Sequence, residues 1–181
     1  MTVTMGRRAG EFAAYAEQAQ QRLFRQAVLL TGDPDSARDL VQSTLVKVYV
    51  AWSRIDTPAA YAQRTMVRTF LDGRRKERRE AELHRPIDPG RADPDPAQAL
   101  TVRQAIAALP PRMRAVVVLR YWEDLTVDQT AAALGCSSGN VKSTASRGLD
   151  KLRELLGDAF VERTSTSTST SAATAAPKEP T

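Results

Sequence analysis

The chain has 181 residues, 42% of them hydrophobic and 6% aromatic, and its mean hydropathy is −0.38. No apolar stretch approaches the roughly 20 residues that a membrane-spanning helix needs, and the first ten residues lack the apolar core of a secretory signal, so we predict a cytoplasmic protein without membrane insertion. A single cysteine and a single histidine exclude an internal disulfide and disfavour a metal site. The formal charge of +5 and the pI of about 9.7 favour a polyanionic partner.

Composition divides the chain into two helical parts and a linker. Residues 84–96 hold four prolines, one glycine and three aspartates, which cannot sustain a helix or a core. From Arg163 onward the sequence is rich in Ser, Thr and Ala and of low complexity, so we expect disorder. We therefore predict an N-terminal extension at 1–9, a first domain at 10–82, a flexible linker at 83–96, a second domain at 97–159 and a disordered tail at 160–181.

The first domain has the pattern of three helices. Apolar residues from Phe12 to Leu30 recur at spacings of three and four, which predicts one amphipathic helix. A turn follows, with Asp33 as the expected N-cap of a second helix and Pro34 as its first residue. A third helix is expected to begin near Pro58. We expect the second helix to turn these apolar side chains inward: Leu40 or Val41, Leu45, Val48, Tyr49 and Trp52.

The third helix leads into a strongly basic stretch. Residues 64–79 include seven Lys or Arg side chains against only Asp72 and Glu77. Such a run is either a solvated helix end or an electrostatic footprint for phosphates. The phosphate interpretation gains weight if the same chain carries a DNA-binding motif.

Such a motif is present in residues 122–156, which have the pattern of a helix-turn-helix. A first short helix over 127–134 is expected to pack through Ala131, Ala132 and Leu134, before a turn that Gly135 permits. Ser137 is the expected N-cap of the second helix, whose apolar side comprises Val141, Ala145, Leu149, Leu152 and Leu156. Its N-terminal half carries the polar and basic residues that could meet base edges in the major groove, namely Asn140, Lys142, Ser143, Ser146 and Arg147.

Nothing in the sequence indicates an enzyme. It has no Gly-rich phosphate loop, no paired acid/base carboxylates and no metal-ligand spacing, and Cys136 has no histidine placed to activate it. We expect no catalytic residue, no cofactor and no metal.

The chain resembles the extracytoplasmic-function sigma factors of bacterial RNA polymerase, and it is similar in overall cast to their actinobacterial branch. The likeness spans about residues 10–157 and is carried by DLVQSTLVKVYVAW (39–52), AYAQRTMVRTFLDGRRKERR (60–79) and, most specifically, by the segment from ALPPRMRAVVVLRYWEDLT through the helix-turn-helix (108–156). The resemblance implies an all-α fold of two small helical domains, similar to sigma regions 2 and 4. It also implies that the linker leaves the two DNA-reading domains unaligned until polymerase fixes their spacing.

The resemblance further implies partners and contact residues. Core RNA polymerase and promoter DNA are the implied partners, and an anti-sigma protein is a further partner that it allows. The β′ clamp helices would meet Asp39, Gln42, Ser43 and Lys47, and the β flap would meet the surface around Arg112 to Tyr121. The −10 element and nearby phosphates would meet Tyr61, Arg64, Arg68, Thr69, Asp72, Arg74, Arg75, Lys76, Arg78 and Arg79. The −35 element would meet Asn140, Lys142, Ser143, Ser146 and Arg147.

Two positions depart from the family pattern. Arg68 stands where many members have Asn, in the region that holds a flipped base. Since Arg only donates hydrogen bonds whereas Asn both donates and accepts, the identity of that base stays open. Ser43 replaces a commonly acidic residue on the clamp-binding face, which weakens one expected polymerase contact.

Two other functions remain open at this point. A free-standing helix-turn-helix regulator with an N-terminal dimerisation or ligand domain would bind palindromic DNA without polymerase. An RNA-binding or phosphoryl-transfer enzyme with an incidental helix-turn-helix is disfavoured by the lack of a phosphate loop.

Overall fold

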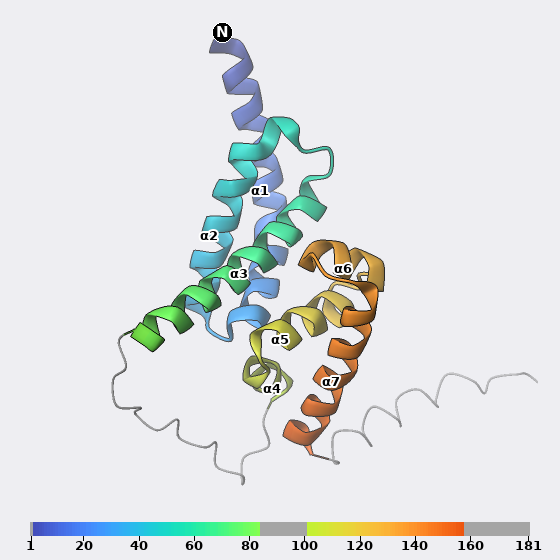
Figure 1. Ribbon diagram of the computed structural model, residues 1–181. Helices are drawn as coiled ribbons and strands as arrows, with labels where there is room; N and C mark the ends of the chain where they lie inside the picture. Colours follow the sequence, from blue (N-terminus) through green and yellow to red (C-terminus); the bar gives the residue numbers. More distant parts are fainter. Residues whose placement is uncertain (1, 84–100, 158–181) are drawn as a thin grey trace, which may run out of the picture.

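The computed structural model describes residues 2–83 and 101–157, with side chains described from Arg8 onward. Every regular element within these two ranges is helical, as predicted (Figure 1). The elements are α1 (Thr2–Thr31), α2 (Pro34–Ala51), a short 3-10 turn η1 (Trp52–Arg54), α3 (Pro58–Leu83), α4 (Val102–Ala108), α5 (Pro111–Val117), a π-helical turn η2 (Val118–Trp122), α6 (Val127–Leu134) and α7 (Ser138–Leu156). Nearly all of the predicted linker and the whole predicted tail lie outside the described residues.

The first domain, α1 to α3, is a three-helix bundle. The predicted start of α2 is confirmed: Pro34 is its first residue, and the Asp33 carboxylate accepts from the Ser36 backbone N–H at 2.8 Å. That hydrogen bond stabilises the charged form and so holds the pKa of Asp33 below its ordinary value. The bundle core is apolar, and its fully buried side chains include Leu23, Leu30, Val48, Met66 and Val67.

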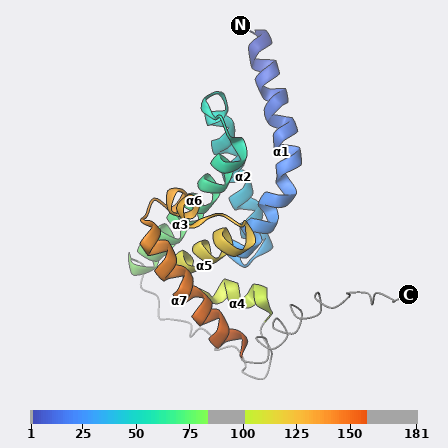
Figure 2. The same ribbon diagram turned by 90° about the vertical axis from the view of Figure 1, so that its right-hand side faces the viewer.

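Two of these helices are longer than the sequence pattern indicated. α1 continues through the predicted extension at 1–9 and projects beyond the bundle (Figure 2). The Arg8 side chain fixes this end, because it donates to the carbonyls of Tyr49 and Val50 at 3.0 and 3.3 Å. These carbonyls are in the last turn of α2, where the Tyr49 carbonyl also accepts from the backbone N–H of Trp52, the C-cap residue. At the other side of the bundle, α3 runs through the whole basic stretch to Leu83.

The second domain, α4 to α7, contains the predicted helix-turn-helix. Capping boxes start α4 and α6, formed by Thr101 with Gln104 and by Thr126 with Gln129. Gly135 ends α6 with a φ of 62°, which is the left-handed conformation expected of it. Residues 116–119, VVVL, are helical although valine is common in strands, and all four side chains are buried.

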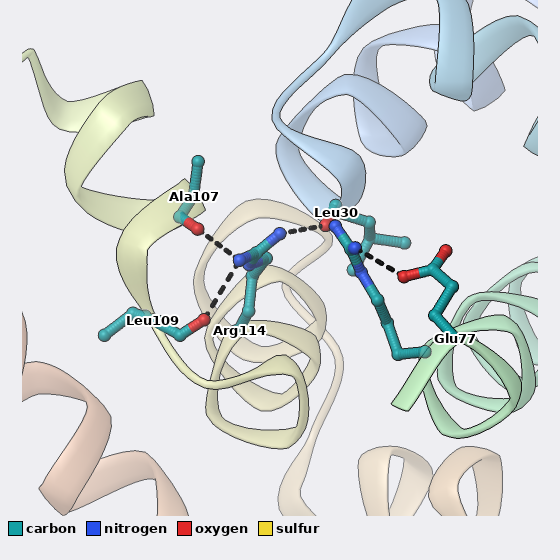
Figure 3. A network of polar contacts seen from close by, with 6 residues as sticks. Leu30, Glu77, Ala107, Leu109 and Arg114 are labelled. Carbon is teal, nitrogen blue, oxygen red and sulfur yellow. Dashed lines mark hydrogen bonds and ion pairs between the residues drawn. The ribbon is translucent and has the colours of Figure 1, made fainter. Parts of the chain in front are cut away.

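The two domains pack against each other, contrary to the expectation that they would be unaligned without polymerase. The main apolar core joins side chains of α1 to α3 with Ala115, Val118, Leu119 and Ala133. α6 lies against α3, and α4 lies against α1 (Figure 1). In Figure 3 the guanidinium of Arg114 lies between the α4 carbonyls and the carbonyl of Leu30 at the end of α1. Buried side-chain contacts, rather than the linker, therefore set the arrangement of the two domains.

Gly148 lets α7 approach α5, and this close contact provides a test of the packing. A Cβ at Gly148 would lie 2.9 Å from Val117 Cγ2, whereas a Cβ at Gly73 in α3 would meet nothing within 4 Å. Gly73→Ala should raise the free energy of unfolding by about 0.5–1 kcal/mol, because Ala is the better helix former. Gly148→Ala gains the same propensity but overpacks a buried contact, which costs about 1–3 kcal/mol.

We therefore expect Gly73→Ala and Gly148→Ala to change the free energy of unfolding in opposite directions, or by amounts that differ by at least about 1 kcal/mol. Urea unfolding of the full chain measures both changes. Equal stabilisation by both would contradict the close approach of α7 to α5.

Candidate nucleic-acid interface

The helix-turn-helix is held rigidly by local polar contacts. Ser137 is the N-cap of α7, as predicted, and its Oγ accepts from the Asn140 backbone N–H at 3.2 Å. Ser138 then ties the two helices together by donating to the Asp128 carboxylate of α6 at 2.6 Å. The position of α7 relative to α6 is thus set by short contacts at the turn, as a helix that enters a groove requires.

The predicted recognition residues all lie exposed on α7. The apolar side of α7 faces inward, with Val141, Ala145 and Leu152 buried, so the opposite side is left for a partner. Two of the polar residues donate hydrogen bonds to backbone carbonyls of α7 itself. Ser143 Oγ donates to the Asn140 carbonyl at 3.1 Å, and Arg147 Nε donates to the Ser143 carbonyl at 3.2 Å. The exposed set consists of Asn140, Lys142, Ser143, Ser146 and Arg147.

The inward side of α6 differs from the prediction by one residue. Ala131 and Ala133 are buried and Leu134 is half-buried, whereas Ala132 is exposed. Three consecutive alanines give no periodic signal, and the prediction of Ala132 was wrong for that reason.

A hollow lies beside the recognition residues. It has a volume of about 310 Å³ and lies between η2, α6 and α7, with Lys142, Ser146, Arg120 and Arg153 among its lining residues. Tyr121 and Trp122, at the end of η2, are 50% and 55% exposed. The rest of the surface expected around Arg112 to Tyr121 is absent, because residues 114–119 are all buried. Within the surface predicted to meet the β flap, Arg112 and Tyr121 are exposed and Met113 and Arg120 are half-buried, so this surface is smaller than expected.

The basic stretch of α3 is exposed and carries ion pairs along the helix. Arg74 pairs with Glu77 at 2.7 Å and Arg78 with Glu82 at 2.9 Å. Exposed pairs of this kind contribute about 0–1 kcal/mol, so a phosphate can displace the acidic partner at little cost. Longer pairs of 3.9 and 3.7 Å join Arg75 to Asp72 and Lys76 to Glu80, and Arg79 has no ion-pair partner within the described part of the chain.

The other residues predicted to meet the −10 element differ in accessibility. Arg64 is exposed, whereas Tyr61 and Thr69 are half-buried. Arg68 Nε donates to the Ala133 carbonyl of α6 at 3.3 Å. Thr69 Oγ1 accepts from Lys47 of α2 at 2.8 Å, so a predicted polymerase-binding residue and a predicted DNA-binding residue contact each other.

The outer face of α2 carries the four predicted polymerase-binding residues and an apolar strip that the sequence analysis missed. Asp39, Gln42, Ser43 and Lys47 are all exposed. Val46 and Val50 are 57% and 71% exposed, and Tyr49, which was expected in the core, is 37% exposed. The segment LVKVYV has more apolar residues than one helix face can bury, and this signal could have revealed the strip.

An apolar groove adjoins this strip between α1 and α2. Its volume is about 700 Å³, and its walls include Phe12, Phe24, Leu45, Val46 and Tyr49. An exposed apolar strip beside an apolar groove is typical of a protein interaction site. No helix among residues 2–83 and 101–157 is long and apolar enough to cross a membrane. Across the same ranges, no group of three or more His, Cys, Asp or Glu side chains could hold a metal ion.

Comparison with known proteins identifies both domains. Residues 15–80 match the family Sigma-70 region 2, and residues 99–152 match Sigma-70, region 4. The RNA polymerase sigma-E factor of Streptomyces coelicolor is 38% identical over 154 residues, which are 81% of this chain and 86% of the relative. The ECF RNA polymerase sigma factor SigL of Mycobacterium tuberculosis is 31% identical over 165 residues, covering 83% of this chain and 91% of that one.

Solved structures agree with this assignment. The sigma factor RpoE of Bartonella quintana, crystallised with the anti-sigma factor NepR, matches with a TM-score of 0.65 and 25% identity over 81% of this chain and 96% of that one. CnrH, in complex with the cytosolic domain of CnrY, shares the fold with a TM-score of 0.56 and 23% identity over 80% of this chain and 86% of that one. The protein belongs to the extracytoplasmic-function group of the sigma-70 family of RNA polymerase sigma factors.

Proposed function

We propose that this sigma factor contacts promoter DNA through two separate helices and core polymerase through a third. The observation that carries the proposal is the outer side of α7, where five small, polar or basic residues are exposed opposite a buried apolar stripe. α7 would contact the −35 element, α3 the −10 element, and the outer face of α2 the polymerase.

The chemistry of α7 suits base recognition in the major groove. Arg147 can donate two hydrogen bonds to the O6 and N7 atoms of a guanine. Lys142 can reach a base or a phosphate, while Ser143 and Ser146 are small enough to let the helix backbone approach the groove. Asn140 lies in the first turn, where backbone N–H groups and the helix dipole also favour a phosphate.

The chemistry of α3 suits backbone binding and an unstacked base. Its exposed arginines and Lys76 would neutralise phosphates beside the −10 element. Arg68 offers donors only, so a flipped base held there must present acceptor atoms. This is a difference from relatives that have Asn at the same place.

The outer face of α2 suits a protein partner. Val46 and Val50 form an apolar centre, and Asp39, Ser43 and Lys47 surround it with polar groups. An apolar centre with a polar rim is the usual composition of a protein interface. By the family resemblance the partner is the β′ clamp, while Tyr121 and Trp122 offer an exposed aromatic surface to the β flap.

An anti-sigma protein is a further proposed partner. The similar RpoE structure is a complex of a sigma factor with the anti-sigma factor NepR. The groove between α1 and α2 is apolar and about 700 Å³ in volume, which suits one face of an amphipathic helix. Such a helix would cover Val46 and Tyr49, so it would compete with polymerase for the same surface.

Open-complex formation tests the proposed function against the free-standing regulator. The full chain mixed with core polymerase should melt a cognate promoter, as detected by permanganate reactivity of unpaired thymines. The chain alone should bind the same DNA weakly, because each domain supplies only part of the contact. Equally tight binding without polymerase would favour the free-standing regulator instead.

Substitution of Arg147 tests the contact with the −35 element. Arg147→Ala should weaken holoenzyme binding to the promoter by about 1–3 kcal/mol, roughly 5- to 150-fold, and relax the preference at one base pair. Lys151→Ala removes a positive charge from the same helix further from its N-terminus, where Lys151 pairs with Glu154, and it should leave the base preference unchanged. Competition binding against a library of −35 variants measures the affinity and the base preference of each variant. An unchanged base preference in Arg147→Ala would contradict the proposed contact of Arg147 with the −35 element.

Substitution of the apolar strip on α2 tests the polymerase contact. Val46→Ser with Val50→Ser should weaken binding to core polymerase about tenfold, because two partly exposed valines lose the free energy of burial at the interface. The unfolding midpoint should hardly change, since both side chains are exposed in the free chain. Val102→Ser replaces a valine of α4 that is 41% exposed, and it serves as the control that should bind normally.

A further inference from the structure

Glu123 joins the two domains through a buried carboxylate. It follows η2 in the second domain, and its side chain is only 5% exposed. Its Oε2 accepts from Arg22 Nη1 of α1 at 3.4 Å and from Gln63 Nε2 of α3 at 2.5 Å. Both partners belong to the first domain. A carboxylate withdrawn from water is costly unless it is paired, so Glu123 stabilises the packed arrangement only while these partners are in place.

The backbone around Glu123 directs it towards the first domain. η2 is a π-helical turn, a wider geometry that is rare and often found at functional positions. Asp124 then adopts a φ of 51°, a left-handed conformation that Asp tolerates better than most residues. The Leu125 backbone N–H closes this turn by donating to the Leu119 carbonyl at 3.0 Å.

Arg114 also makes a polar contact across the junction, but unlike Glu123 it would keep some of its hydrogen bonds if the two domains separated. Arg114 donates to the Leu30 carbonyl of the first domain at 2.6 Å, but it also donates to the Leu109 carbonyl within its own domain at 3.0 Å. It would therefore keep part of its hydrogen bonding after the domains part. The hydrogen-bond partners of Glu123 described above would both be lost, which makes it the contact most sensitive to separation.

A buried amide of α1 lies near these contacts. Gln26 lies one helical turn from both Arg22 and Leu30, on the side of α1 that faces the second domain. It is fully buried, and neither its amide nitrogen nor its amide oxygen has a hydrogen-bond partner. A buried polar group without a partner destabilises the arrangement that buries it.

We propose that Glu123, with Arg22 and Gln63, is a latch that holds the free sigma factor closed, and that polymerase binding requires its release. In the closed form α6 lies on α3 and Arg68 is bonded to the Ala133 carbonyl. The consequence for polymerase and promoter binding rests on the proposed function, whereas the latch itself can be measured without polymerase or DNA.

Distance measurements between the domains test the latch. Spin labels at the exposed positions Ser53 and Lys151, in a Cys136→Ser background of the full chain, should give one narrow distance distribution. Arg22→Ala and Glu123→Arg should each give a broad distribution at longer distances, with the helical content unchanged by circular dichroism. The charge swap Arg22→Glu with Glu123→Arg should restore the narrow distribution, since it rebuilds the ion pair. Asp124→Asn is the matched control, because it removes one carboxylate from the same turn and should leave the distance unchanged.

Unchanged distances in both single variants would overturn the latch, as would opening by Asp124→Asn or failure of the charge swap to restore closure. Binding to core polymerase then tests its role. If the free chain is closed about nine-tenths of the time, Arg22→Ala should raise the apparent affinity for core polymerase about tenfold. An opened Arg22→Ala chain that binds polymerase no more tightly would overturn the requirement for release, even if the proposed sigma function holds in open-complex assays.

Discussion

The packing of helix ends at the domain junction depends on the buried side chain of Arg114. Its guanidinium is buried and donates to the carbonyls of Leu30, Ala107 and Leu109, which lie at the ends of α1 and α4. Helix ends leave carbonyls without partners, and the helix dipole favours a positive charge beside them. The same guanidinium lies 5.8 Å from the ring centroid of Phe70 in α3. One residue of α5 therefore provides hydrogen-bond donors to the terminal carbonyls of two helices from different domains, and it contacts a third helix.

Residues 115–119, which run from the end of α5 into η2, are apolar on every side. The first domain covers Ala115, Val118 and Leu119, while Val117 faces α7 and Val116 packs with the helix-turn-helix. A helix that is apolar all round is stable only when all of its faces are buried. Separation of the domains would expose the first of these faces to water. The open form is thus favoured where a partner replaces the first domain on that face.

Features with local causes could be predicted from the sequence. Asp33, Ser137 and Gly135 end or start helices through contacts within a few residues, and the exposure of Lys142 and Arg147 follows from the periodicity of α7. The packing of the domains could not be predicted, because its polar contacts join residues 60 to 101 positions apart and their side chains resemble ordinary surface residues in the sequence. The apolar strip on α2 was missed for a different reason: Tyr49 was assigned to the core by its residue type, although α2 has only one inward face.

The two proposed DNA-contact surfaces differ in what the closed arrangement does to them. The outer side of α7 is exposed, so closure leaves its recognition residues free to meet a groove. Arg68 of α3, in contrast, already donates to the Ala133 carbonyl, and a donor-only side chain cannot give the same N–H to a base. An Asn at this position has a shorter side chain that extends less far towards α6, so the Arg in this chain couples the −10 residue to domain packing. The Nε–H of Arg68 is therefore available to a base only if α6 moves away from α3, whereas its Nη groups, which belong to an exposed side chain, and the residues proposed for the −35 element need no such movement.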